Sequence, residues 1–327
     1  MRHTVRPALV LLLSLLLLAP PAALAGDDKK DVDKIGERDV GKGWNLYSLE
    51  REIALGKQLA QMVEQSARLV EDPVVIEYVD RVAQNLVRNS DARVPFTVKV
   101  IDSDELNAFA LPGGFFFVNS GLVLAADEEA ELAGVMAHEI AHVTARHGTR
   151  TATKAQIAQW AMIPLIIFGP GGWAGYGIYQ GLNFGLPLAF LKFSRNAERE
   201  ADFLGIQYMY KAGYDPTSFI TFFEKIREIE RKRPGSVPKI FSSHPPTQDR
   251  VTKAQAEIAE LLPAREEYVI TSSEFDKVKQ RLATLMAGRS VEEKEEGRPT
   301  LRKREGDQEE KEGEEKEDQP PVLKRRP

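Results

Sequence analysis

The sequence predicts an α+β domain that is mainly helical, with a small β-sheet or hairpin beside a central helix. Long stretches repeat apolar residues with helical spacing, whereas strand-like patterns are confined to residues 94–121. The composition fits a folded core, because 43% of the 327 residues are hydrophobic and 28% are charged. We therefore expect several helices packed around one short β region.

The first elements of the domain are two helices and the β region. Helical spacing predicts helices over 48–65 and 74–89, and Pro73 stands where a helix tolerates proline best, in its first turn. Residues 94–102 (VPFTVKVID) predict a strand. Residues 107–121 (NAFALPGGFFFVNSG) predict two more strands that fold back on each other about the Pro-Gly-Gly turn.

A long central helix is expected next, from Asp127 to His147. The acidic residues at its start suit the positive end of the helix dipole, and Asp127 is the expected cap. Further helices are predicted over 195–213, 215–232, 251–262 and 273–286.

The two ends of the chain differ from the domain in composition. Arg2, His3 and Arg6 precede an apolar run, and the small residues Ala23 and Ala25 follow it, which is the order of a secretory signal peptide. The apolar run is shorter than the ~20 residues of a membrane span. The predicted organisation is a signal peptide at 1–25, a flexible lead-in at 26–45, the folded domain at 46–289 and a disordered charged tail at 290–327.

One internal segment stands out because residues 155–191 carry no charged side chain. Proline and glycine recur along it, which is rare in the middle of a membrane-spanning helix. Three interpretations stay open: a buried apolar hairpin, a segment that dips into a membrane or contacts its surface, or a lid over a site.

The types of residue present limit the chemistry. The chain has no cysteine, so thiolate nucleophiles, thiolate zinc ligands and disulfide bonds are excluded. The net charge of −5 gives no reason to expect nucleic acid as a partner. Any metal site must therefore be built from histidine and carboxylate ligands.

The central helix carries the sequence HEIAH at 138–142, although the whole chain has only five histidines. Residues four apart lie on one face of a helix, so His138 and His142 can bind one zinc ion through imidazole nitrogens. Glu139 is rotated by one step of ~100°, which places it beside the metal. There it can take a proton from a water activated by the metal and pass it to a leaving amine.

A catalytic zinc needs a third protein ligand. His147 is five residues past His142 and turns away from the ligand face, so it is a helix-end residue or a partner outside the ligands. Glu198 and Asp202 lie four apart on one helix face, whereas Glu200 points away from Glu198. We expect Glu198 to be the third ligand and Asp202 to accept a hydrogen bond from the outer nitrogen of a ligand histidine.

Four stretches in order resemble one family: the NAFALPGGFFFVNSGL hairpin, the HEIAH helix, the SRNAEREAD helix and the SHPPTQDR loop. They are similar to the zinc metallopeptidases that include the CAAX prenyl proteases and HtpX, and most to the soluble periplasmic bacterial branch. The resemblance covers about residues 46–262. It implies a zincin-like domain with one Zn²⁺ per chain, in which His138, His142 and Glu198 are ligands, Glu139 is the general base and Asp202 supports a ligand.

The hairpin also predicts a place for the substrate, because a strand beside a zinc site can pair with an extended peptide. The candidate residues are Ala108, Phe109, Ala110 and Leu111, with Gly113 and Gly114 leaving room for a peptide backbone. An ordinary buried hairpin is the alternative interpretation.

Two residues of the SHPPTQDR loop are further candidates. His244 is expected to approach the site, either as a fourth zinc ligand that keeps the enzyme latent or as an oxyanion donor. A loop histidine that only packs is the alternative. Arg250 is a candidate ion-pair partner for a carboxylate such as Asp202.

The sequence thus predicts an exported, periplasmic metalloendopeptidase whose substrates are polypeptides. The resemblance implies that these are misfolded or unassembled cell-envelope proteins. Two alternatives stay open: a catalytically silent, zinc-stabilised holdase for unfolded envelope proteins, and a membrane-embedded protease. Glu139 favours an enzyme, because a holdase has no use for a carboxylate beside the metal.

Overall fold

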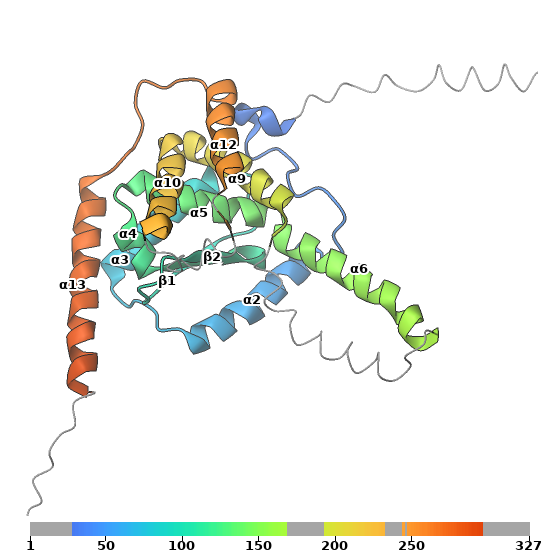
Figure 1. Cartoon of the computed structure of the whole chain (residues 1–327), viewed down its shortest axis with the longest axis horizontal. Helices are drawn as coiled ribbons and strands as arrows, with labels where there is room; N and C mark the ends of the chain where they lie inside the picture. Colours follow the sequence, from blue (N-terminus) through green and yellow to red (C-terminus); the bar gives the residue numbers. More distant parts are fainter. Residues whose placement is uncertain (1–27, 169–192, 233–243, 246, 297–327) are drawn as a thin grey trace, which may run out of the picture. The chain divides into compact units, whose positions relative to one another are not determined.

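The computed structural model describes residues 28–168, 193–232, 244, 245 and 247–296, with elements labelled as in Figure 1. The helices are α2 (Leu49–Ser66), α3 (Pro73–Arg88), α4 (Ser120–Ala125), α5 (Glu129–Thr144), α6 (His147–Phe168), α9 (Arg195–Ala212), α10 (Thr217–Lys232), α12 (Gln248–Leu261) and α13 (Ser273–Glu296). The strands are β1 (Thr97–Ile101), β2 (Ala108–Leu111) and β3 (Phe115–Asn119), and the short 3-10 helices are η1 (Asp28–Lys30), η2 (Val32–Lys34) and η3 (Pro112–Gly114). The predicted α+β, mainly helical fold is confirmed.

The strands form one mixed sheet in the order β1-β3-β2. Strand β1 runs parallel to β3, whereas β2 is antiparallel to it and is joined to it by η3, as the hairpin prediction requires. Helix α2 contacts β2 from one side of the sheet and α5 contacts it from the other (Figure 1). Strand β2 is therefore the sheet edge that lies against the central helix.

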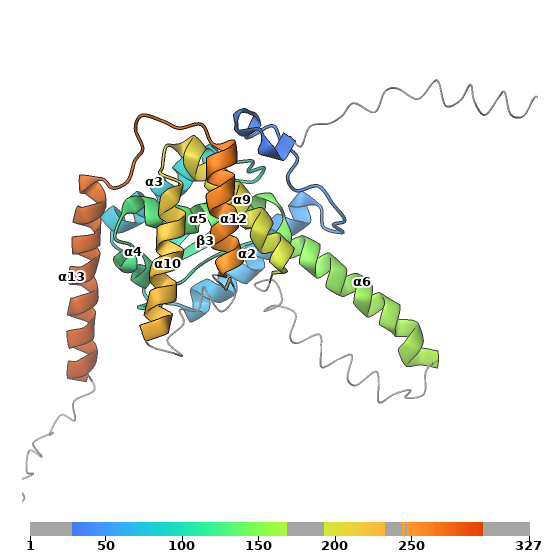
Figure 2. The same ribbon diagram turned by 45° about the horizontal axis from the view of Figure 1, so that its top comes forward.

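Helix α5 is the centre of the domain, and each of its residues is buried. The fully buried side chains of Met136 and Ile140 each stabilise the fold by about 1.5–3 kcal/mol. Helix α9 lies directly against α5, because Gly205 has no side chain: a Cβ there would lie 3.1 Å from the backbone nitrogen of His138. Helices α10 and α12 pack beside this pair (Figure 2). The close contact brings one face of α9 over the HEIAH motif.

The central helix is shorter than the sequence predicted. It begins at Glu129, and Asp127 is not its cap; Asp127 pairs instead with Lys225 at 2.5 Å. It ends at Thr144, and Arg146 has a φ of 55°, a left-handed conformation that a helix cannot continue. His147 is thus the first residue of α6, and its side chain takes a new direction.

The lead-in and the tail also differ from expectation where they are described. Arg38 and Val40 belong to the predicted lead-in, yet both are buried in the domain. Helix α13 extends past the predicted Met286 to Glu296, and contacts divide the chain into two units at this helix, Met1–Met286 and Ala287–Pro327. The second unit is described only as far as Glu296.

Two predicted segments lie outside the described residues, namely the signal peptide and most of the uncharged segment 155–191. Residues 155–168 of that segment are described, and they continue helix α6. In the part of the chain that the structure describes, no helix combines the length and the apolar character needed to cross a membrane.

Candidate metal centre

Four side chains converge between α5, α9 and the loop before α12. His138 and His142 come from α5, Glu198 from the first turn of α9, and His244 from the loop; we call them the donor cluster. One nitrogen or oxygen of each lies within 4.8 Å of the others, and all four side chains are buried. The structure thus brings together the three predicted ligands and the loop histidine.

The spacing of these atoms fits a tetrahedral zinc ion. Zinc bonds of about 2.0–2.1 Å hold ligand atoms about 3.3 Å apart. The Nε2 atoms of His138 and His142 lie 3.1 Å apart, and they lie 3.5 and 3.6 Å from the Glu198 carboxylate. The Nδ1 atom of His244 lies 3.4 Å from His138 Nε2 and 2.8 Å from Glu198 Oε1. Imidazole and carboxylate donors at these separations suit zinc.

The charges of the cluster call for a cation. Burial opposes the charged form of His138, but the neighbouring carboxylates of Asp202 and Glu198 outweigh it and raise the pKa of His138 to about 9. Burial and the nearby His138 hold the pKa of His142 well below its usual value. Burial would raise the pKa of Glu198, yet hydrogen bonds from His138 and His244 lower it. A positive charge is therefore stabilised where the donors meet.

An ion pair outside the donors orients His138. Asp202 Oδ1 lies 3.0 Å from the outer nitrogen of His138, as predicted for the partner of a ligand. Arg250 holds both oxygens of Asp202, at 2.6 and 2.7 Å, which is the predicted ion pair. The same guanidinium donates to the backbone oxygens of His244 and Pro245, so it also holds the loop.

Glu139 lies beside the donors rather than among them. Its Oε2 accepts a hydrogen bond from the Ala110 backbone N–H at 3.3 Å, so strand β2 fixes its position. Its Oε1 is buried and has no hydrogen-bond partner among the described residues; His244 Nε2 lies 3.5 Å away. Burial raises the pKa of this carboxyl group. Such a carboxylate is suited to accept a proton.

The edge strand beside Glu139 directs alternate backbone groups away from the sheet. Asn119 donates to the Asn107 carbonyl, and hydrogen-bonded pairs alternate along an antiparallel ladder. Ala108 and Ala110 therefore direct their backbone groups away from β3. The side chains of Ala108 and Leu111 are buried, and Phe109 stacks on Phe117 with ring centroids 5.2 Å apart.

The expectation that Gly113 and Gly114 leave room for a substrate backbone is wrong. Both residues are buried, with φ of 76° and 90°. A Cβ at Gly113 would lie 2.6 Å from Ile53 Cα in α2, and one at Gly114 would lie 2.2 Å from the Pro95 carbonyl. The two glycines therefore let the domain's own backbone approach the turn.

Three contacts around His142 were not found from the sequence. His147 Nδ1 lies 2.9 Å from His142 Nδ1, and Glu200 Oε2 lies 3.0 Å from His147 Nε2. The ring of Phe193 stacks on His142 with centroids 4.0 Å apart. His147 was expected outside the ligands, but nothing in the sequence linked it to Glu200, because the kink at Arg146 redirects it.

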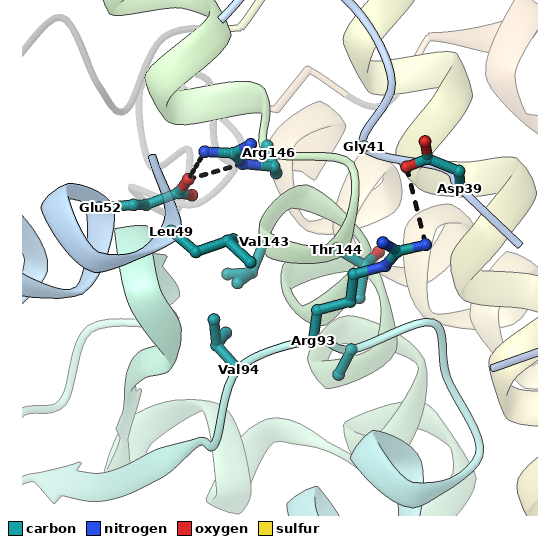
Figure 3. Close-up of a pocket in the computed structure, with 10 residues that line it drawn as sticks. Asp39, Gly41, Leu49, Glu52, Arg93, Val94, Val143, Thr144 and Arg146 are labelled. Carbon is teal, nitrogen blue, oxygen red and sulfur yellow. Dashed lines mark hydrogen bonds and ion pairs between the residues drawn. The ribbon is translucent and has the colours of Figure 1, made fainter. Parts of the chain in front are cut away.

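Two cavities adjoin the end of α5. A small one beside His142 is lined by Ala110, Leu111, Pro112 and Phe193 among others. A larger one, of about 90 Å³, contains none of the four donors. Figure 3 shows that its charged side chains pair with each other, Arg146 with Glu52 and Arg93 with Asp39. Its polar groups are thus matched within the protein, and the chemistry lies at the donor cluster.

A mainly helical domain with a mixed sheet, a buried HEIAH helix and a donor cluster suited to zinc define a zinc metallopeptidase. The chain belongs to peptidase family M48, whose sequence model matches residues 71–258. This range holds all four donors and Glu139.

The relatives agree with this membership. The beta-barrel assembly-enhancing protease of Escherichia coli (strain K12) is 32% identical over 250 residues, which cover 74% of this chain and 50% of the relative. A putative protease of the same name from Vibrio cholerae is 32% identical over 78% of this chain and 53% of its own length. The mitochondrial metalloendopeptidase OMA1 of Schizosaccharomyces pombe is 33% identical over 58% and 55%. The chain therefore spans about half the length of these relatives.

Proposed function

We propose that this protein is a zinc-dependent endopeptidase, in which His138, His142 and Glu198 bind one zinc ion and Glu139 is the general base. One observation carries the proposal above the others. Among the residues that the structure describes, the buried Glu139 carboxylate keeps one oxygen without a hydrogen bond directly beside four converging metal donors. A domain that used zinc only for stability would gain nothing from leaving that oxygen unmatched.

Glu139 performs the proton transfers of the reaction. The donor cluster would hold a zinc ion, whose chemistry there would be to polarise the scissile carbonyl and to acidify water. Glu139 accepts the proton of that water and later donates it to the leaving amine. The Ala110 N–H holds Oε2, so Oε1 is the oxygen left for this transfer. The raised pKa of Glu139 makes it a stronger base at neutral pH.

The substrate is an extended polypeptide that pairs with the outer edge of β2. The Ala110 carbonyl points away from β3 and can hydrogen-bond a peptide in sequence-tolerant fashion. The Ala110 N–H is already bound to Glu139, and Ala108 is only 1% exposed, so this carbonyl is the group of the pair that is left for a peptide. Leu111 and Phe109 support this edge by packing into the domain. The scissile bond then lies close to Glu139, because that residue is tied to the same strand.

His244 acts as a fourth donor in the resting site. Its Nδ1 lies within hydrogen-bond distance of Glu198, and its Nε2 lies near Glu139. A catalytic zinc needs an open position for its substrate, so His244 must withdraw before peptide binds. This contact makes the resting enzyme latent.

The proposed setting is the periplasm, with misfolded or unassembled envelope proteins as substrates. The basic and apolar start of the chain supports export. The similarity to proteases named for beta-barrel assembly supports an envelope role.

The test of the enzyme assignment is Glu139→Gln, compared with wild type in a casein-cleavage assay. We expect one zinc per chain by elemental analysis in both proteins, and a rate that is about 10²–10⁴-fold lower in the variant. A chelator should abolish wild-type cleavage, and added zinc should restore it. Full activity of Glu139→Gln would remove Glu139 from the reaction.

The test of latency is His244→Ala. We expect a higher basal rate and weaker zinc binding, because one donor is lost and the open position is freed. Unchanged cleavage, both basal and in the presence of unfolded protein, would refute the latency role while leaving the enzyme assignment in place.

A further inference from the structure

Within the described part of the chain, the outer nitrogen of His142 faces an imidazole rather than the carboxylate or carbonyl that a zinc-ligating histidine commonly faces. It lies 2.9 Å from Nδ1 of His147, a residue that is 3% exposed. His147 is the first residue of α6, just past the kink at Arg146. The kink therefore places a second imidazole directly behind a ligand.

The far side of His147 is also held. Its Nε2 lies 3.0 Å from Glu200 Oε2. The other oxygen of Glu200 accepts from Lys29 Nζ at 2.5 Å, and Arg150 lies 3.4 Å from Oε2. An acidic residue of α9 is thus fixed between two cations and one imidazole.

Zinc binding would determine where the protons lie on His142 and His147, which form a row with Glu200. When zinc occupies Nε2 of His142, the proton of that ring must sit on Nδ1 and point at His147. His147 Nδ1 then accepts it, which puts the proton of His147 on Nε2, facing Glu200. In this arrangement His142, His147 and Glu200 all have a hydrogen-bond partner. Zinc binding and the hydrogen bonds therefore favour the same tautomers of the two histidines.

We propose that His147 and Glu200 are positioning residues that fix the orientation and the tautomer of His142 for zinc; this rests on the proposed zinc site. The arrangement parallels the contact of Asp202 with His138. Helix α9 thereby supplies one ligand, Glu198, and the carboxylates that orient both histidine ligands.

The experiment compares His147→Ala, His147→Asn and Glu200→Ala with wild type. Arg199→Ala is the matched control, because Arg199 is the exposed neighbour of Glu200. The zinc dissociation constant is measured by competition with a chromogenic chelator, independently of activity. We expect it to rise about 10–100-fold in His147→Ala and less in Glu200→Ala. Arg199→Ala should match wild type.

The conservative variant separates positioning from general stability. The side-chain oxygen of asparagine can accept from His142 in place of Nδ1, so His147→Asn should recover most of the zinc affinity. Peptide KM should stay unchanged in all variants, because neither residue touches the β2 edge. In cobalt-substituted protein, the His142 N–H resonance should be broadened by solvent exchange in His147→Ala and retained in His147→Asn.

Unchanged zinc affinity in both His147→Ala and Glu200→Ala would overturn this inference alone. A loss in His147→Ala that His147→Asn does not recover, accompanied by an equal loss of thermal stability without metal, would also overturn it. Wild-type protein that binds no zinc would overturn the proposed function as well, so the two failures are distinguishable.

Discussion

Helices α5 and α9 hold two buried polar clusters between them, and the two differ in how their groups are matched. One is the donor cluster. The other, which we call the Arg38 cluster, consists of Arg38, Asp91, Thr144, Gln207 and Tyr208. In it, Arg38 donates to both oxygens of Asp91 and to Gln207 Oε1, and Tyr208 donates to Asp91. In the donor cluster, two imidazole nitrogens and a carboxylate face one another instead.

The two clusters also differ in whether buried side-chain atoms in or beside them lack a hydrogen bond. Among the described residues, the buried side-chain atoms without a hydrogen bond include Glu139 Oε1, which lies beside the donor cluster, but none from the Arg38 cluster. Buried charge alone therefore does not mark a functional site, since both clusters have it. The donor cluster differs because its imidazole nitrogens and carboxylate oxygens converge within 4.8 Å of one another, where one cation can bind them together.

The largest expected effect on metal binding comes from replacing a residue of the donor cluster. His142→Gln should weaken zinc binding by about 3–4 kcal/mol, or roughly 10²–10³-fold, since one ligand of the set is lost. Peptide cleavage should fall at least as much. The free energy of unfolding of the metal-free protein should change by less than about 1–2 kcal/mol, the size of the contribution expected from the His142 contacts with His147 and Phe193. Chelator competition and urea unfolding measure the two quantities.

The Arg38 cluster should show the opposite response. Asp91→Asn leaves a guanidinium with a side-chain exposure of 1% facing a neutral partner, which should lower the free energy of unfolding by about 3–5 kcal/mol. Zinc affinity of the folded protein should stay within about twofold. Asp39→Asn is the control, since Asp39 and Arg93 form an exposed pair at 3.8 Å. Equal losses of unfolding free energy in Asp91→Asn and Asp39→Asn would show that burial of the ion pair does not determine the size of the loss.

Arg250 forms an ion pair with Asp202, which in turn contacts a residue of the donor cluster. Its replacement tests whether this ion pair supports zinc binding or only the stability of the fold. Lysine keeps the charge but cannot hold both Asp202 oxygens and the loop carbonyls with one planar group. Arg250→Lys should weaken zinc binding about 10–100-fold. Arg227→Lys, at a partly buried arginine that donates to Gln248, should leave zinc binding unchanged. A wild-type dissociation constant in Arg250→Lys would assign Arg250 to stability alone.

The smallest effect concerns Glu257, a partly buried acid near the donor cluster. Burial, together with the charge of Asp202, raises its pKa from 4.5 to about 7. The folded protein therefore binds this proton more tightly than the unfolded chain, so ionisation above pH 7 costs stability, and the cost disappears below about pH 4.5. Glu257→Gln should be more stable than wild type at pH 8, by up to about 1 kcal/mol after solvent screening. The difference should vanish at pH 4.5, with Glu260→Gln as the exposed control.

The ligands could be predicted because their geometry is local. His138 and His142 share a helix face by their spacing, and so do Glu198 and Asp202. The hairpin of β2 and β3 was predicted from its turn residues for the same reason. The end of α5 was not, because the kink at Arg146 depends on long-range contacts with Glu52 and the Tyr47 carbonyl.

By itself the sequence determined which residues share a helix face, that cysteine takes no part, and that a metal site must use histidine and carboxylate. These properties depend on residue type and on the repeat of the helix. Only the tertiary structure decided that His244 meets Glu198, that His147 meets Glu200, and that the turn glycines serve packing. Those contacts join segments that are separate in the chain. The contacts of His244 and His147 with α9 depend on Gly205, which allows α9 to lie against the backbone of α5.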